Sequence, residues 1–288
     1  MKRGAELIHD IDACSLRRGE LGLWWLGQHS FVVKLGAAII YIDPFLTPMK
    51  GRLIPPLLSP TDLAHADLIL GTHDHADHID RPAWPSIADA APKAKFVVPD
   101  LLKERLSQEL KIPLERFIGL DDGPLIGAAG AGVSNSWTHD FGAVRVYGVA
   151  AAHEFLDQDR ASGRYPHLGY IVEGNGCTLY HSGDCCIYEG LQTTLLRWKI
   201  DVVMLPINGR DAERLARGCI GNMTYQEAAD LAGALEPRCT IPAHFDMFEG
   251  NLGDPIAFAD YMRVKYPKLR VHVPVHGERC VVEARKTE

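Results

Sequence analysis

The chain has 288 residues, a formal net charge of −7, and the apolar and charged fractions of an ordinary globular protein (47% and 23%). The acidic balance disfavours a general binder of nucleic acid or of anionic membranes, because no basic excess is present to neutralise phosphates. It still allows a small anionic substrate. Seven scattered cysteines in a chain long enough to build a large core indicate reduced thiols, and no secretory signal or membrane-length apolar run is visible. We therefore expect a cytoplasmic protein.

The first half of the chain is predicted to consist mostly of strands. Residues 1–20 are expected to form an N-terminal arm or a short helix, followed by a single domain over residues 21–288. Runs rich in β-branched and aromatic residues, separated by glycine turns, indicate the strands. They cover residues 21–26, 31–35, 38–42, 67–70, 95–98, 133–139 and 143–150. A proline-rich loop at 44–60 and a helix at 101–110 interrupt the series.

The second half mixes strands with helices. A hairpin is predicted from strands 168–173 and 177–181, with Gly174-Asn175-Gly176 as its turn. Helices are then expected at 188–198, 224–235 and 255–266, and strands at 201–205, 239–241, 270–273 and 279–282. Two sheets packed face to face, with helices outside, satisfy this α/β pattern.

A dense group of metal-binding residue types follows the strand at 67–70. The sequence His-Asp-His-Ala-Asp-His at 73–78 places three imidazoles and two carboxylates within six residues. These groups are the usual protein ligands of zinc and also bind manganese and iron. In an extended stretch His73 and His75 point the same way and can share an ion, while a turn at Asp77 and His78 can offer ligands to a second ion. The alternative is a polar loop that begins a helix, which so many titratable groups after a buried strand disfavour.

Two coordination spheres need ligands from elsewhere in the chain. His153, Asp184 and His244 each lie three positions past the end of a predicted strand. Taken singly, each would be an ordinary buried histidine or a capping aspartate. Because strand ends converge where such folds place their sites, the three together are expected to complete the site. A carboxylate at Asp184 is suited to bridging two cations.

The sequence resembles the metallo-β-lactamase fold superfamily, through the motif at 73–78 followed by His153, Gly183-Asp184 and His244 in the family's order. Within it, the chain is similar to the L-ascorbate-6-phosphate lactonase family. The segments that carry this likeness are 25–31, 42–45, 180–184, 205–211, 220–225 and 241–248. The resemblance implies a four-layer αββα sandwich.

The resemblance also implies a ligand set for two divalent metal ions, Mn²⁺ or Zn²⁺. One ion would be held by His73, His75 and His153, and the other by Asp77, His78 and His244, with Asp184 between them. The chain departs from the superfamily at one position, because Cys185 follows the Gly-Asp pair where threonine is common. Cys185 could alter a contact that supports a ligand or bring a thiol near the metals, but we do not expect it to be a ligand, because Asp184 already suits the bridging position.

This likeness implies a metal-dependent hydrolase, most specifically a lactonase acting on L-ascorbate 6-phosphate or a related phosphorylated sugar lactone. Two cations lower the pKa of a water that they share, so that a bridging hydroxide can attack the lactone carbonyl. Asp77 and Asp184 are the predicted catalytic residues, Asp77 also orienting the water or carrying a proton. The alternatives are a phosphodiesterase acting on a small or cyclic nucleotide, and a non-catalytic metal-binding protein.

Other polar residues are candidates for substrate binding or support. Arg210 could bind an anionic group of the substrate, or form a salt bridge with Asp211 or Glu213. Asn208 and Asn222 could contact hydroxyls or shape turns, and His181 could line the site. Asp43 could accept a hydrogen bond from a ligand histidine, or be a turn residue before proline. The expected partner is a small anionic molecule, with no nucleic acid and no membrane, and with a homo-oligomer as a further expectation.

Overall fold

The computed structural model describes residues 1–122 and 138–283. Its strands form two mixed sheets. In spatial order, the first contains β13 (Arg279–Val282), β1 (Leu21–Gly27), β2 (Ser30–Leu35), β3 (Ala38–Ile42), β4 (Leu68–Leu70), β5 (Lys95–Pro99) and β6 (Phe117–Leu120). The second contains β12 (Cys239–Ala243), β11 (Val202–Pro206), β10 (Cys177–His181), β9 (Leu168–Gly174), β8 (Val144–Ala150) and β7 (Thr138–Asp140).

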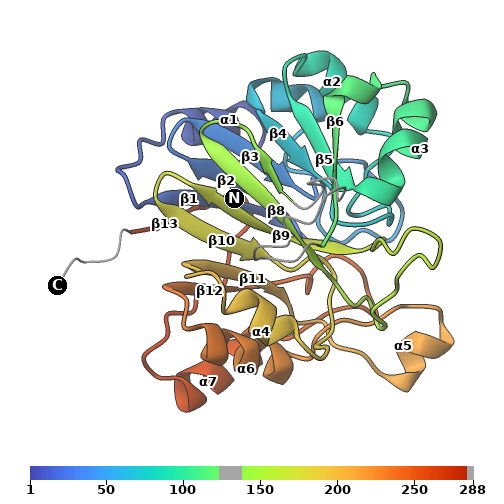
Figure 1. The fold of residues 1–288 in the computed structure, drawn as a ribbon. Coiled ribbons are helices and arrows are strands. Elements are labelled where there is room, and N and C mark those ends of the chain that lie inside the picture. Colours follow the sequence, from blue (N-terminus) through green and yellow to red (C-terminus); the bar gives the residue numbers. More distant parts are fainter. Residues whose placement is uncertain (123–137, 284–288) are drawn as a thin grey trace.

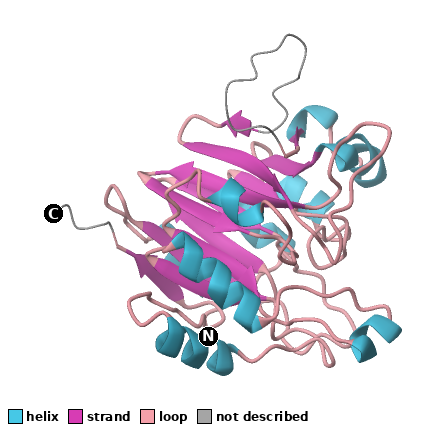
Figure 2. Cartoon of the chain, turned by 60° about the horizontal axis from the view of Figure 1, so that its bottom comes forward, coloured by secondary structure: helices cyan, strands magenta, loops and turns pink. Residues whose placement is uncertain are grey.

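The helices lie outside the two sheets (Figures 1 and 2). Those of the first half are α1 (Gly4–Asp12), α2 (Trp84–Ala90) and α3 (Asp100–Leu110), with the 3₁₀ turns Pro60–His65 and Leu114–Arg116. Those of the second half are α4 (Leu191–Leu195), α5 (Ala212–Ala216), α6 (Tyr225–Leu235) and α7 (Pro255–Lys265). In the described residues no helix is long and apolar enough to cross a membrane.

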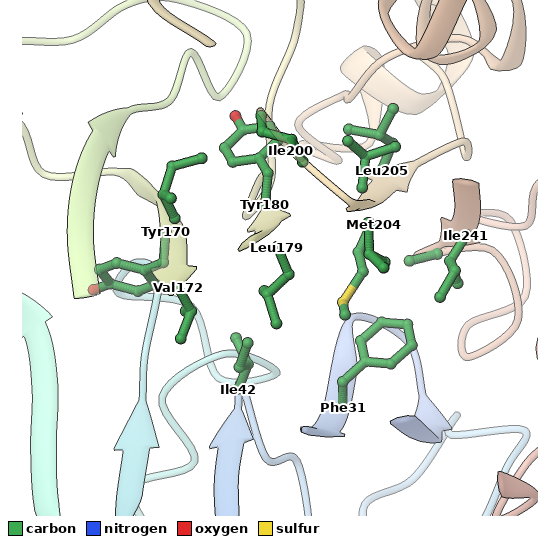
Figure 3. Close-up of a cluster of buried hydrophobic side chains, with 14 of the residues drawn as sticks. Phe31, Ile42, Tyr170, Val172, Leu179, Tyr180, Ile200, Met204, Leu205 and Ile241 are labelled. Carbon is green, nitrogen blue, oxygen red and sulfur yellow. The ribbon is translucent and has the colours of Figure 1, made fainter. Parts of the chain in front are cut away.

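Successive side chains of the strands point to opposite faces of the sheet, and this alternation produces two separate apolar cores. On β1, Leu23 and Trp25 belong to the core between the sheets, whereas Trp24 and Leu26 belong to the core under α1, α2 and α3. Successive side chains of a strand point to opposite faces, so a strand covered on both sides is apolar throughout. Figure 3 shows the core between the sheets, where Phe31 approaches Met204. The predicted α/β fold with two face-to-face sheets is confirmed.

Most predicted elements are observed, with several differences in their bounds. The hairpin turn contains only Asn175 and Gly176, because Gly174 pairs with Cys177; both turn residues have positive φ (49° and 77°), as a tight hairpin with matching twist requires. The predicted helix 188–198 is shortened to α4, since Gly190 has a φ of 95° immediately before it. Residues 270–273 are not a strand and contribute only a single bridge, Thr240 to Val271.

Some elements were not predicted, and one lies mostly outside the described residues. β6, α2 and α5 were missed; they are only four, seven and five residues long, too short for a clear periodic pattern. The strand predicted at 133–139 lies outside the described residues except for its last two positions, which belong to β7. Within residues 1–20, the structure contains α1.

Trp84 of α2 should be a major determinant of stability. Its side chain is fully buried, with ring centroids 5.1 Å from Phe96 and 6.5 Å from Phe117. We expect Trp84→Ala to lower the free energy of unfolding by about 3–5 kcal/mol, because it leaves a cavity between α2 and the first sheet. Chemical denaturation would measure the change. A loss of under 1 kcal/mol would contradict this packing role, and exposed Leu196→Ala is the matched control.

Candidate metal centre and cleft

The residues of the 73–78 motif are held in a compact turn directly after β4. The backbone N–H of His78 and that of Ile79 both donate to the carbonyl of His75, at 3.1 and 2.8 Å. This turn brings His73 Nε2 within 2.9 Å of His75 Nδ1. His153 follows β8 and adds its Nε2 at 3.3 Å from the same His75 nitrogen. The three imidazoles form the first group of possible metal ligands.

A second group contains Asp77, His78 and His244. Asp77 Oδ2 lies 3.6 Å from His78 Nε2 and 3.7 Å from His244 Nε2. His244 follows β12 and has a φ of 57°, a left-handed conformation that histidine seldom adopts. Two ligand atoms that each lie about 2.1 Å from one ion at a tetrahedral angle are about 3.4 Å apart, so these separations suit a shared cation.

Asp184 lies between the two groups. Its Oδ1 is 3.4 Å from His78 Nε2, and its Oδ2 is 3.1 Å from His244 Nε2 and 3.7 Å from His153 Nε2. This carboxylate therefore reaches the second group with both oxygens and the first group with one. The structure brings all seven predicted ligands together, from four separate places in the chain.

The protonation states of His73, His153 and Asp184 suit metal binding. Burial lowers the pKa of His73 well below its usual value and that of His153 to about 4, so both imidazoles are neutral and keep a free lone pair. Burial alone would raise the pKa of Asp184, but His244 and His78 hold it well below its usual range. Ionised carboxylates and neutral imidazoles are the forms that bind metal.

The Nε2 atom of His78, which faces the carboxylates, also indicates a site for a metal ion. His78 Nε2 is buried and makes no well-formed hydrogen bond. Burial lowers the pKa of His78, yet Asp184, Asp77 and Asp43 together raise it well above its ordinary value. The site therefore requires a positive charge near the carboxylates and a partner for Nε2, which a metal ion can bind in place of a proton. A divalent cation satisfies both requirements, so the residues present fit a metal.

Asp43 supports the cluster from behind. Its Oδ2 accepts hydrogen bonds from His78 Nδ1 at 2.6 Å and from Thr72 Oγ1 at 2.8 Å, and its Oδ1 accepts one from the Thr72 backbone. The residue is fully buried and has a φ of 48°. Because His78 donates from Nδ1 to Asp43, its Nε2 is the nitrogen available to a metal. Asp43 thus accepts a hydrogen bond from a predicted ligand histidine, as expected from the sequence.

Asp43→Ala should weaken metal binding or hydrolysis by about 10- to 100-fold, the effect typical of losing a carboxylate that orients a ligand histidine. Metal titration followed by elemental analysis would measure it. Asp62→Ala, which changes a half-buried aspartate that caps a 3₁₀ turn, is the control. Unchanged metal affinity in Asp43→Ala would mean that Thr72 and the fold alone orient His78.

Two residues of the site were missed in the sequence. Gln28 Nε2 donates to Asp77 Oδ2 at 2.8 Å and lies 3.1 Å from His244 Nε2. His29 Nδ1 lies 3.5 Å from Asp184 Oδ1. Both belong to the turn between β1 and β2 and are buried. The available signal was the turn itself, because a two-residue connection usually contains asparagine and glycine, not glutamine and histidine.

A cleft of about 360 Å³ opens beside the predicted metal ligands. Its lining combines five of those ligands with two loops, one after α5 and one after β12. The lining residues are His75, Asp77, His153, Asp184, Arg217, Gly218, Cys219, Ile220, His244, Phe248, Glu249, Gly250 and Asn251. Arg217 and Asn251 were not among the predicted substrate-binding residues.

The four residues predicted to bind substrate do not line this cleft. Arg210 forms a two-pronged ion pair with Glu227, at 2.7 Å for each nitrogen, so its partner is neither Asp211 nor Glu213. His181 is buried; its Nε2 donates to the carbonyl of His29 at 2.9 Å, and burial lowers its pKa to about 3. Asn208 and Asn222 are buried and hydrogen-bonded to each other.

Cys185 follows Asp184 in the chain and is a buried free thiol. Its Sγ donates to the carbonyl of Cys186 at 3.1 Å. Burial raises the pKa of Cys185 to about 12, and the thiol belongs to none of the groups of possible metal ligands among the described residues. The substitution at this position therefore leaves the ligand set to histidines and aspartates.

Comparison with known proteins places this site in a family. A family model described as a beta-lactamase superfamily domain matches residues 39–245. A UPF0173 metal-dependent hydrolase of Pyrococcus furiosus is 30% identical over 237 residues, which are 81% of this chain and 88% of that protein. Another, from Caldivirga maquilingensis, is 25% identical over 256 residues, 89% of this chain and 96% of that protein.

A solved structure shows the same fold. Igni18, described as a novel metallo hydrolase from Ignicoccus hospitalis, superimposes with a TM-score of 0.69 at 22% identity, covering 92% of this chain and 100% of Igni18. None of these three names specifies a substrate, so the lactonase assignment stays a prediction. The chain belongs to the metallo-β-lactamase superfamily and, within it, to the UPF0173 family of metal-dependent hydrolases.

Proposed function

We propose that this protein opens the ring of a sugar lactone that carries an anionic group, with L-ascorbate 6-phosphate as the model substrate. The observation that carries the proposal is the cleft itself. Its volume of about 360 Å³ lies near the lower end of the range for small-molecule sites, about 300–1,000 Å³. Five of the predicted metal ligands and Arg217 both line it. That combination suits a short ester with a charged substituent.

The proposed cofactors are two divalent cations, Mn²⁺ or Zn²⁺. When bound, they would lower the pKa of a water molecule and polarise the lactone carbonyl. The chain supplies the remaining functions. His78 and His244 hold the pKa of Asp77 below its ordinary value although burial raises it, so this carboxylate is ionised. Gln28 fixes one of its oxygens. An ionised, fixed carboxylate at the cleft can orient the attacking water by accepting its hydrogen bond.

The net charge of the chain also favours a small-molecule substrate over nucleic acid or a membrane. With a formal net charge of −7, the protein has no basic excess to bind nucleic acid or an anionic membrane. We therefore expect it to act on a small molecule, and we propose the cytoplasm as its location. Whether it does so as a homo-oligomer can be measured by light scattering on the purified protein.

The test is hydrolysis of a panel of substrates by protein loaded with manganese or zinc. We expect L-ascorbate 6-phosphate and related sugar lactones to be opened with kcat/KM of about 10⁴ M⁻¹s⁻¹ or more. The panel includes bis-para-nitrophenyl phosphate and cyclic nucleotides, since the same ligand set serves phosphodiesterases. Hydrolysis of phosphodiesters alone, or of no lactone, would overturn the proposal.

A further inference from the structure

A chain of three asparagine side chains leads from the interior to the wall of the cleft. Asn222 Nδ2 donates to Asn208 Oδ1 at 3.2 Å, and Asn208 Nδ2 donates to Asn251 Oδ1 at 2.7 Å. Asn222 is 0% exposed and Asn208 is 4% exposed, whereas Asn251 is half-buried and lines the cleft. The direction of donation is the same at both steps.

This direction determines which group Asn251 offers to a ligand. An asparagine amide has one oxygen acceptor and one NH₂ group with two donors. Because Asn251 Oδ1 already accepts from Asn208, the Nδ2 donors are the part of the amide left for the cleft. The backbone of Asn251 is held as well, since its N–H donates to the carbonyl of Phe248 at 3.0 Å. Asn251 is therefore an oriented donor.

Arg217 adds positive charge to the same wall. Its Nη2 lies 3.4 Å from the carbonyl of Gly250, the residue before Asn251. Gly250 has a φ of 83°, and a side chain there would lie 3.3 Å from the same nitrogen, so glycine permits the approach. The ion pair of Arg217 with Glu213 is 3.0 Å long, with side chains 52% and 81% exposed, which leaves it weak in water.

Taking the proposed hydrolase function as given, we infer that Asn251 and Arg217 form the substrate-specificity wall of the cleft, and that Asn208 and Asn222 position Asn251. The wall presents amide and guanidinium donors, so it recognises an oxygen-rich substrate with a phosphate or carboxylate group. Glu249, on the exposed tip of the same loop, also lines the cleft and opposes anions. In this inference Arg217, not Arg210, binds the anionic group of the substrate. Asn251, not Asn208 or Asn222, contacts its oxygen atoms.

The kinetic test compares L-ascorbate 6-phosphate with L-ascorbate, two lactones that differ only in the phosphate. Arg217→Ala should raise KM for the phosphorylated lactone at least tenfold and leave the other unchanged. Asn251→Ala should lower kcat/KM for both by about tenfold. Asn208→Ala should do the same, but should have no added effect in the Asn251→Ala background, because it acts through that residue. Exposed Arg263→Ala and Gln192→Ala are the controls.

A binding test gives an answer even if no lactone is hydrolysed. Calorimetric titration of the metal-loaded protein with inorganic phosphate should show at least tenfold weaker binding in Arg217→Ala, tighter binding in Glu249→Gln, and no change in Arg263→Ala. Phosphate binding that is absent, or insensitive to Arg217 and Asn251, would overturn the inference. Additive effects of Asn208→Ala and Asn251→Ala would overturn the positioning role. A protein that binds phosphate through Arg217 but opens no lactone would keep this wall and reject only the lactonase proposal.

Discussion

Asp184→Asn should lower hydrolysis by about 10³-fold and reduce the amount of metal bound per chain. Asp184 lies 3.1 Å from His244 Nε2, 3.4 Å from His78 Nε2 and 3.7 Å from His153 Nε2, so its carboxylate faces both ligand groups. An amide supplies similar volume but no negative charge and only one acceptor oxygen. Stabilisation by a metal site is worth several kcal/mol, and each 1.4 kcal/mol corresponds to about tenfold in rate.

The measurement pairs steady-state kinetics with elemental analysis of the same preparation. Asp260→Asn, an exposed aspartate of α7, is the matched control and should retain full metal content and rate. Circular dichroism would establish that Asp184→Asn is folded. If the folded variant kept both its metal and its activity, Asp184 would not be a ligand, and the assignment of the cluster would have to be rebuilt around Asp77.

Removal of metal by a chelator should abolish hydrolysis and lower the thermal unfolding midpoint. Asp77 and Asp184 are close to one another among buried histidines, and each carboxylate raises the other's cost of ionisation unless positive charge is present. A cation that binds only the folded chain stabilises it by about 2.7 kcal/mol at a free concentration of 100 times its Kd. We expect that adding back either manganese or zinc restores both the hydrolysis and the thermal unfolding midpoint.

Differential scanning calorimetry of the chelated and reloaded protein would measure the stability change, with activity followed in parallel. The Asp184→Asn variant serves as the internal control, because its midpoint should respond weakly to the chelator. A metal-free protein with an unchanged midpoint and full activity would contradict metal dependence of this chain. Restoration of the midpoint without activity would separate a structural metal from a catalytic one.

The predicted ligand set could be assembled from the sequence because its signals are local. Three histidines and an aspartate of the 73–78 motif are neighbours in the chain, and a short turn after β4 is enough to gather them. His153, Asp184 and His244 could be added because each follows a strand, and strand ends at one edge of a sandwich meet. Asp43 was found by the same reasoning, at the end of β3.

The residues around the ligands could not be found in this way, because their partners are distant in the chain. Gln28 contacts Asp77 and His244, from which 49 and 216 residues separate it. Arg210 pairs with Glu227, whose carboxylate is held in place because it also accepts a hydrogen bond from the Thr224 backbone in the capping box of α6. Nothing local to Arg210 distinguishes this partner from a substrate anion.

By itself, the sequence determined the chemistry of this protein: apolar strands covered on both faces, and a set of imidazoles and carboxylates in the order of a metal-dependent hydrolase. Only the tertiary structure decided which polar side chains face the cleft. Asn251 and Arg217 reach it, whereas Arg210, Asn208, Asn222 and His181 are taken up by contacts within the protein. The physical reason is that ligand chemistry is a property of residue types, while the direction of a side chain depends on the elements that pack around it.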